Sequence, residues 1–239
     1  SSFKEKIEKN FVNTECIIAG ENLGYAKGNN LGLSKVKTKY ALILNPDAEL
    51  ENNTLSNFFN IANSIKKFAI IAPAIQDEKN IKNNVLELTE VDSVKGFAMF
   101  LNLEEFKDVG FFDDKFFIYL EEIDLCRRLR KKNKKIFLDP NILIYHQGGS
   151  SHEAKYNFEM ELSRNWHWMW STFYFTKKHK GFSYALLNVS NKLISALIKY
   201  IFYSLTLKNS KKLIYKNRIS GLFNSIIGKS SWYRPFNNN

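Results

Sequence analysis

The chain has 239 residues, 44% hydrophobic and 25% charged, so it can bury a sizeable core and is not an intrinsically disordered segment. Only four prolines and eleven glycines are present, which excludes collagen-like and low-complexity architectures. The net charge of +11 lies entirely after residue 150, since residues 1–150 hold 21 basic and 21 acidic side chains and residues 151–239 hold 14 basic and 3 acidic ones. This split indicates an anionic partner, either a membrane or a nucleic acid, rather than a uniformly basic nucleic-acid-binding domain.

The N-terminal residues and the cysteines indicate the compartment. The first ten residues open directly into a helical pattern, without the charged, apolar and cleavage regions of a signal peptide. We therefore expect no signal peptide and a chain that begins inside a domain. Cys16 and Cys126 lie far apart and match neither a disulfide framework nor a zinc site, which favours a reducing compartment.

The pattern between residues 14 and 145 alternates strands with helices, as in α/β proteins. It predicts strands at residues 14–19, 40–44, 68–75, 91–101, 135–138 and 142–145. It predicts helices at residues 24–37, 55–67, 104–109 and 121–132, and a polar loop at residues 77–84. The run Tyr40–Leu44 is continuously apolar, which is typical of a central parallel strand covered on both faces.

No strand pattern follows residue 153. Residues 154–178, 182–207 and 209–228 are predicted to form three basic, aromatic-rich helices. We therefore expect two domains, residues 1–152 and residues 153–239.

No stretch is predicted to span a membrane. The most apolar segment, Tyr184–Leu207, is interrupted by Asn188, Asn191, Lys192 and Lys199. Its apolar residues recur at spacings of three and four, which favours a helix that lies in an interface or packs in a bundle.

The first group of residues suited to catalysis or ligand binding is Leu44–Glu49, where carboxylates follow a buried strand. In open α/β sheets this end of a strand faces the ligand crevice. Asp47, with Glu49 nearby, has the chemistry to hold a hard divalent cation that neutralises a diphosphate. The alternative is a simple turn, because Asn-Pro-Asp is common turn chemistry.

The second constellation is Tyr119–Asp124, with three carboxylates in four residues at the start of a predicted helix. Acids in a first turn complement the helix dipole, which accounts for many such clusters. Adjacent carboxylates also raise one another's pKa, so that one of them can act as a general base.

The third constellation is Ile144–Ser151, in which His146 ends an apolar strand before a Gly-Gly-Ser-Ser loop. A histidine at a strand end is often a structural hydrogen-bonding residue. The loop lacks the lysine and the spacing of a P-loop, so a nucleoside triphosphatase is not indicated.

Taken in order, these segments resemble inverting family 2 glycosyltransferases, and closely the bacterial rhamnosyltransferase-like branch. Asn22–Asn30 looks like the branch's nucleotide-side segment, and Leu44–Asp47 looks like its variant of the Asp-x-Asp metal motif. Phe111–Arg128 is similar to its Gly-Phe-Asp to Glu-Asp-x-Asp-Leu-x-x-Arg run, and Tyr145–Ser150 to its Tyr-His-x-Gly-Gly-Ser. The resemblance covers about residues 20–152 and, more loosely, the helical tail.

The resemblance implies a role for each matching residue. The metal ligands would be Asp47 and His146, holding Mg²⁺ or Mn²⁺. The catalytic base would be Glu122, with Glu121 as the alternative and Asp124 as a third acid of the same run. The nucleotide-sugar would be bound by Asn22, Gly24, Lys27, Asn30, Asn45, Asp47 and Gly96.

Three departures from the family pattern are visible. Glu122 stands where the family usually has Asp, and Asn45 replaces the first Asp of the metal motif, which removes a charge from the cation site. The family's first strand, ending in Thr-Tyr-Asn, and its second, ending in Val-Asp-Asn, are missing. The expected fold is therefore a GT-A-type (Rossmann-like) mixed sheet flanked by helices, without its first βαβ portion, followed by a C-terminal helical appendage.

The resemblance implies transfer of rhamnose or a similar deoxyhexose from a nucleotide-diphosphate sugar, with inversion, in cell-surface polysaccharide synthesis. The acceptor would be a saccharide or a lipid-linked molecule, and the protein would be cytoplasmic, attached peripherally to the anionic inner face of the membrane. Two alternatives stay open. One is a non-catalytic fragment or scaffold of the same fold, and the other is a nucleic-acid-binding protein that uses the aromatic residues of 166–174 as stacking surfaces.

Overall fold

Five short strands form the central sheet of the structure, a computed structural model that describes residues 2–65, 67–73, 87–146 and 153–234. Their order is β1-β5-β3-β6-β4, and the strands are β1 (Tyr40–Leu44), β5 (Ala98–Asn102), β3 (Ile70–Pro73), β6 (Ile136–Asp139) and β4 (Thr89–Glu90). Only β3 and β6 pair in parallel, and the other three pairs of this sheet are antiparallel. The sheet is therefore mixed, as the sequence predicts.

The expectation of a central parallel strand at Tyr40–Leu44 is wrong. In the described sheet β1 is an edge strand that pairs antiparallel with β5, Tyr40 opposite Asn102 and Leu44 opposite Ala98. Its side chains are mostly half-buried. An apolar run reports burial by neighbouring helices and strands, and it does not report strand order or direction.

Alternation along the inner strands divides the core into two layers. On β3 and β5, Ile70, Ala72, Met99 and Leu101 pack in one cluster with the helices α2 (Gly24–Leu33) and α4 (Glu121–Lys131). Ile71, Ala98 and Phe100 pack in the other cluster with Phe58 and Ala62 of α3 (Thr54–Ser64). The sheet thus lies between helices on both faces.

A second, two-stranded sheet pairs β2 (Ala48–Leu50) with β7 (Ile144–His146) in antiparallel register. Ala48 lies opposite His146, and Glu49 lies opposite Tyr145. This ladder joins the segment after β1 to the end of the α/β body. The remaining short elements of that body are α1 (Ser2–Asn10) and the 3₁₀ helix η1 (Leu103–Phe106).

Residues 14–19 do not form the predicted buried strand. They lack regular structure and are mostly exposed, Ile18 at 62%. The backbone N–H of Cys16 donates to the Glu8 carboxylate instead of to a neighbouring strand. An apolar run becomes a strand only where another strand satisfies its backbone groups. Of the predicted strand at 91–101, only Ala98–Asn102 is a strand, and the predicted loop at 77–84 lies outside the described residues.

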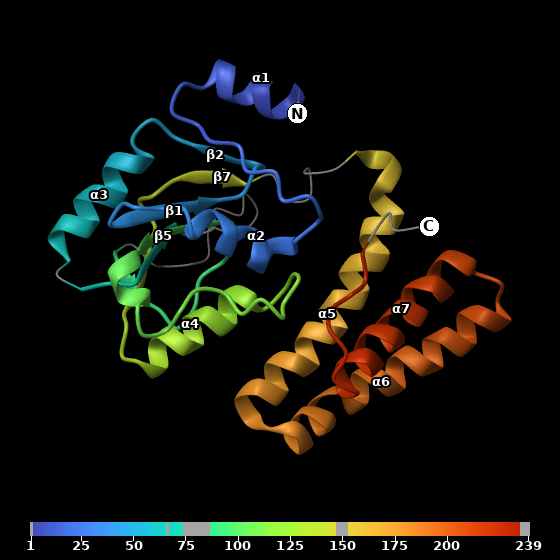
Figure 1. Cartoon of the computed structure of the whole chain (residues 1–239). Coiled ribbons are helices and arrows are strands. Elements are labelled where there is room, and N and C mark those ends of the chain that lie inside the picture. The colour runs from blue at the N-terminus through green and yellow to red at the C-terminus, as the bar shows by residue number, and fades with distance from the viewer. Residues whose placement is uncertain (1, 66, 74–86, 147–152, 235–239) are drawn as a thin grey trace.

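The C-terminal region forms the predicted helices, α5 (Asn157–Lys180), α6 (Phe182–Leu205) and α7 (Asn209–Ile226), preceded by the 3₁₀ helix η2 (Ala154–Tyr156). Figure 1 shows α5 between the α/β body and the α6–α7 pair. Trp166 and Trp170 of α5 belong to the same core cluster as α2 and α4. The helical region is therefore packed directly onto the α/β core.

The expectation that no segment is long and apolar enough to span a membrane is wrong for α6. By length and composition this helix qualifies, and only 17% of its most apolar window is buried. Its asparagines and lysines lower the mean hydropathy to 1.2 without bringing it below the range of spanning helices.

Candidate active site

A cavity of about 340 Å³ lies where the residue after β1, the loop before β5 and the start of α4 converge. It is lined by Tyr25, Asn45, Lys95, Gly96, Phe97, Ile118, Tyr119, Glu121, Glu122 and Ile144. Four residues predicted from the sequence therefore meet in one pocket: Asn45, Gly96, Glu121 and Glu122. The cavity has the size of a small-ligand site and contains two adjacent carboxyl groups.

The two glutamates occupy different electrostatic environments. Glu121 is 4% exposed, and its Oε2 has no hydrogen-bond partner among the described residues. Burial raises the pKa of Glu121 to about 8, and the neighbouring Glu122 carboxylate adds to the rise. Burial also raises the pKa of Glu122, but backbone hydrogen bonds and the Lys95 ammonium counteract part of that rise. Glu122 is thus the acid of the pair that ionises more readily.

The turn that presents these acids is strained. Tyr119 and Leu120, directly before α4, have φ values of 74° and 68°, in the left-handed region that non-glycine residues avoid. Such a residue costs about 1–3 kcal/mol and persists where the surrounding packing enforces it, often at functional sites. Tyr119 also lines the cavity. The strain therefore lies in the two residues that directly precede Glu121 and Glu122.

Gly96 and Tyr25 line the cavity beside the acids. The Tyr25 hydroxyl donates a hydrogen bond to the Gly96 carbonyl. A Cβ on Gly96 would lie 2.8 Å from that hydroxyl oxygen and 3.6 Å from the Glu122 Cβ. Only a glycine leaves room here for both side chains.

The two predicted metal ligands are neighbours in the backbone. Asp47 precedes β2, whose first residue, Ala48, pairs with His146 of β7. The side chain of His146 lies outside the described part of the structure, so its distance from the Asp47 carboxylate stays a prediction. Among the described residues no group of three or more His, Cys, Asp or Glu could hold a metal ion. One carboxylate and one imidazole nevertheless fit a cation whose other ligands are phosphate oxygens and water.

Most residues of the predicted nucleotide-side segment have structural partners outside the cavity. The Asn22 carboxamide accepts a hydrogen bond from the Gly24 N–H at 3.0 Å. Gly24 has φ +72°, and a Cβ there would clash with the Phe117 carbonyl oxygen. Asn30 bonds the Phe112 backbone at both its N–H and its carbonyl, at 3.0 and 2.9 Å. Lys27 is exposed and lines a different cavity. The segment thus holds α2 against residues 112–117, and it places Tyr25 in the cavity.

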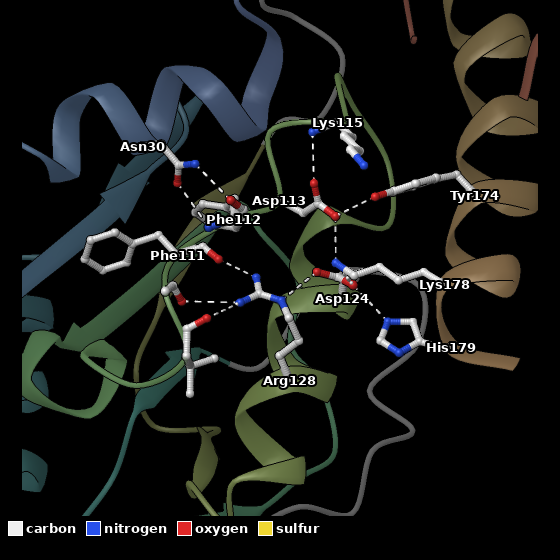
Figure 2. A network of polar contacts seen from close by, with 12 residues as sticks. Asn30, Phe111, Phe112, Asp113, Lys115, Asp124, Arg128, Tyr174, Lys178 and His179 are labelled. Carbon is white, nitrogen blue, oxygen red and sulfur yellow. Dashed lines mark hydrogen bonds and ion pairs between the residues drawn. The ribbon is translucent and has the colours of Figure 1, made fainter. Parts of the chain in front are cut away.

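Asp124, the third predicted catalytic acid, does not line the cavity. It is completely buried, and Figure 2 shows its carboxylate enclosed by cationic and imidazole partners. Its Oδ2 accepts from Arg128 Nε at 2.8 Å, and its Oδ1 lies 2.8 Å from both Lys178 Nζ and His179 Nε2. Burial lowers the pKa of His179 in spite of this contact, so a neutral ring donates its Nε2–H to Asp124. Asp124 therefore fastens α4 to α5.

The network continues into the loop before α4 (Figure 2). Lys178 also pairs with Asp113 at 2.7 Å, and the Tyr174 hydroxyl donates to the same carboxylate at 2.8 Å. Arg128 donates to the carbonyls of Val109 at 2.9 Å and of Phe111. Burial alone would raise the pKa of Asp113, but its hydrogen bonds, that from Lys178 foremost, outweigh burial and lower it.

Sequence reasoning did not select several residues that the structure brings to the site. Tyr25 and Lys95 each stand beside a glycine that was selected, and they line the cavity. Lys178 and His179 act on α4 from more than 50 residues away. No local motif signals such a partner, because helical spacing in α5 predicts only which of its residues share a face.

The similar proteins that the comparisons find are enzymes that transfer sugars. No family model matches the chain. Over 146 residues it is 29% identical to the low-salt glycan biosynthesis hexosyltransferase Agl10 of Haloferax volcanii, a match that covers 50% of this chain and 47% of that protein. Over 186 residues it is 26% identical to the rhamnosyltransferase WbbL of Escherichia coli strain K12, covering 63% of this chain and 69% of that protein. The match to Agl10 thus spans about half of that relative's length.

Among solved structures, the mannosyltransferase PcManGT of Pyrobaculum calidifontis, in complex with GDP-mannose and Mn²⁺, is similar in fold. The superposition has a TM-score of 0.54 and 12% sequence identity, and it covers 94% of this chain and 73% of that one. The likeness extends over both the α/β body and the helical region.

Proposed function

We propose that this chain, which is similar in sequence to the hexosyltransferase Agl10 and the rhamnosyltransferase WbbL, is an inverting family 2 glycosyltransferase that transfers a hexosyl group from a nucleotide-sugar to a hydroxyl acceptor. The observation that carries the proposal is the cavity that Glu121, Glu122 and Asn45, the residue after β1, line together. A base and a donor-side polar group are then within one small pocket, as displacement at a sugar carbon requires.

Glu122 is the general base of this proposal. Its carboxylate takes the proton of the acceptor hydroxyl while the oxygen forms a bond to the anomeric carbon. The bond from that carbon to the diphosphate oxygen breaks, and the nucleoside diphosphate leaves with the electron pair. Attack from the face opposite the leaving group inverts the configuration. Glu121, protonated at neutral pH by its raised pKa, adds no second negative charge beside the base.

The leaving diphosphate needs a positive counter-charge. Asp47 and His146 would hold a divalent cation, Mg²⁺ or Mn²⁺, which when bound neutralises the diphosphate. PcManGT was solved with Mn²⁺ and GDP-mannose, which supports a cation and a nucleotide-sugar for this fold. Lys95 lines the cavity and adds a fixed positive charge on the protein side.

The finer assignments follow the relatives. WbbL is a rhamnosyltransferase, so the proposed donor is a nucleotide-activated rhamnose or similar deoxyhexose. Agl10 acts in glycan biosynthesis, which supports a saccharide or lipid-linked acceptor in surface polysaccharide synthesis. The proposed domains are residues 1–152 for the transfer reaction and residues 153–239 for the helical region.

A comparison of two donors tests this function. The protein is incubated with Mn²⁺, an acceptor saccharide mixture and either dTDP-rhamnose or GDP-mannose, and release of the nucleoside diphosphate is measured. Release from dTDP-rhamnose that exceeds release from GDP-mannose and requires the acceptor is the expected result. Donor binding without release from any nucleotide-sugar would favour the non-catalytic scaffold instead.

We further propose that α6 attaches the protein to the anionic inner face of the cell membrane. One face of α6 packs on the neighbouring helices through Ala185, Val189 and Ala196. The large exposed apolar residues of the helix are Phe182, Tyr184, Leu186, Leu187, Ile194, Leu197, Ile198, Ile201, Phe202 and Leu205. Exposed apolar surface of this extent is typical of an interaction site.

Charge selects the partner for this face. No acidic residue follows Glu161 in the chain, whereas ten basic residues lie between Arg164 and Lys216, with three more beyond them. Each basic side chain near an anionic leaflet contributes about 1 kcal/mol, and salt screens the attraction. An amphipathic helix with basic flanks thus fits an anionic bilayer surface better than nucleic acid.

Sedimentation with lipid vesicles tests the attachment. We expect binding to vesicles with phosphatidylglycerol, weaker binding at high salt, and loss of binding in Leu187→Ser/Ile198→Ser. The matched control, Leu55→Ser/Phe59→Ser on α3, removes two exposed apolar residues of the α/β body and should bind as wild type does. Indifference to anionic lipid, or a concentration-dependent dimer that the α6 variant abolishes, would contradict the proposal.

A further inference from the structure

A second cavity, of about 790 Å³, lies between the start of α2, residues 114–117, α5 and the C-terminal segment 228–234. It shares no lining residue with the cavity that holds Glu121 and Glu122. Its volume falls within the range of small-molecule sites. The proposed transfer reaction gives it no role.

Positive charge converges on this cavity from four separate segments. Its basic lining residues are Lys27, Lys115, Lys177, Lys229 and Arg234. None of these forms an ion pair with an acidic side chain in the described part of the chain. The acidic lining residues are only Glu21 and Asp114. Because like charges gathered around one hollow repel each other, an anion bound there lowers the free energy.

The C-terminal wall of the cavity is fixed by hydrogen bonds. The Trp170 indole donates to the Lys229 carbonyl at 3.0 Å, and the Ser231 hydroxyl donates to the Lys115 carbonyl at 2.8 Å. The Arg234 guanidinium lies 3.7 Å from the centre of the Phe117 ring and donates to the carbonyl of Ser231 at 2.7 Å. Arg234 is therefore held in place before any ligand arrives, which reduces the entropy lost on binding.

Five aromatic residues also line the cavity: Phe116, Phe117, Trp170, Tyr174 and Trp232. Aromatic faces bind sugar rings and nucleobases as well as lipid chains, while the cations bind phosphate. We propose that this cavity is a second binding site, which takes a ligand with a phosphate or diphosphate group attached to a ring or an apolar moiety. The phosphate belongs either to a free sugar phosphate or nucleotide or to a lipid headgroup.

Calorimetric titration of the whole chain with inorganic pyrophosphate tests the site. The test variant is Lys177→Ala/Lys229→Ala, and the control is Lys35→Ala/Lys37→Ala, which lowers the net charge equally and leaves the cavity intact. We expect saturable binding by wild type and control, at least about tenfold weaker in the test variant. Emission from Trp170 and Trp232 should change with the same saturation curve.

A second arm distinguishes the sources of the phosphate. Phosphatidylcholine vesicles with and without phosphatidic acid are sedimented with the same three proteins, all of which keep α6 intact. If the cavity takes a lipid headgroup, the test variant should bind phosphatidic acid more weakly than the control variant does. If the cavity takes free ligands, the test variant should bind pyrophosphate more weakly and phosphatidic acid as the control does. Equal affinity of test and control variants for both probes, or no saturable binding by wild type, overturns the proposal.

Discussion

Two adjacent glutamates at the start of α4 differ in the charges around them. Glu121 is almost completely covered and no cation among the described residues lowers its pKa, whereas the Lys95 ammonium lowers that of Glu122. Carboxyl groups that differ in this way divide into one neutral acid and one ionised base. These environments therefore assign the proton-accepting role to Glu122 and leave Glu121 as its neutral neighbour.

Substitution of Glu121 should change how stability depends on pH. The folded pKa of about 8 lies above the model-compound value of 4.5, so wild type loses stability as the pH rises between these values. Glu121→Gln removes this loss and should be more stable above pH 8, by up to about 5 kcal/mol, with no gain below pH 4.5. Urea unfolding of both proteins across this pH range measures it. A wild-type stability that stays flat through the window would refute the assignment.

Gly96→Ala should narrow the cavity and destabilise the fold. The new Cβ would lie 2.8 Å from the Tyr25 hydroxyl, so Tyr25 must move and its hydrogen bond to residue 96 is lost. We expect a loss of about 1–3 kcal/mol in the free energy of unfolding. Adding Tyr25→Phe, which removes the clashing atom, should recover part of it.

The control for Gly96→Ala is Gly28→Ala. Gly28 lies within α2, and a Cβ there has nothing within 4 Å. This change should be neutral or stabilising by up to about 1 kcal/mol. Equal destabilisation by both alanines would mean that the contact between Gly96 and Tyr25 does not limit the space at this position.

At the scale of elements, α4 is positioned by contacts at its start and in its middle. The strained turn at Tyr119 and Leu120 sets its start, and Asp124 and Arg128 tie its middle to α5 and to the loop at 109–111. A completely buried carboxylate with three partners is costly to disturb, because each lost partner leaves charge without compensation. The network thus couples the helical region to the helix that carries the acids.

Lys178→Met should break the centre of this network. Lys178 pairs with both Asp113 and Asp124, and its loss leaves the buried Asp124 with Arg128 and His179 alone. We expect a loss of about 1–3 kcal/mol in the free energy of unfolding. Lys177→Met, an exposed neighbour, should change it by less than about 0.5 kcal/mol. Indistinguishable urea midpoints of the two variants would contradict the role given to Lys178.

The same network gives the loss from Lys178→Met a pH dependence. The folded pKa of Asp113 is lowered, so its contribution is present above the unfolded pKa of about 4 and is lost as the pH falls through the folded value. The difference between wild type and Lys178→Met should therefore shrink in acid. A difference that grows on acidification would show that Asp113 is not stabilised through Lys178.

For the whole molecule, local patterns in the sequence predict most helices, whereas long-range pairing decides the order and position of the strands. Periodicity predicts α3, α4 and all three C-terminal helices, since each depends on residues three or four apart. The strand order, the edge position of β1 and the absence of a strand at 14–19 depend on partners far along the chain. Such pairing leaves no local signal.

The candidate site, too, is predicted by the sequence only in part. Motif order predicts that Asn45 and the glutamate pair share a site, and the structure places them around one cavity together with Gly96. The same order also selects Asn30 and Asp124, whose hydrogen bonds reach residues 82 and 55 positions away. A motif identifies residues that act together, and their contacts distinguish those that face the cavity from those that hold it in shape.

Transfer kinetics of the two glutamate variants test the central claim most directly. Glu122→Gln should lower turnover by about 10²–10⁴-fold with little change in nucleotide-sugar affinity, because a general base acts in the transition state. Glu121→Gln, the matched control one residue away, should retain most of the turnover, since the wild-type side chain is already neutral at pH 7. Loss of turnover in Glu121→Gln with activity retained in Glu122→Gln would contradict the account and move the base to Glu121.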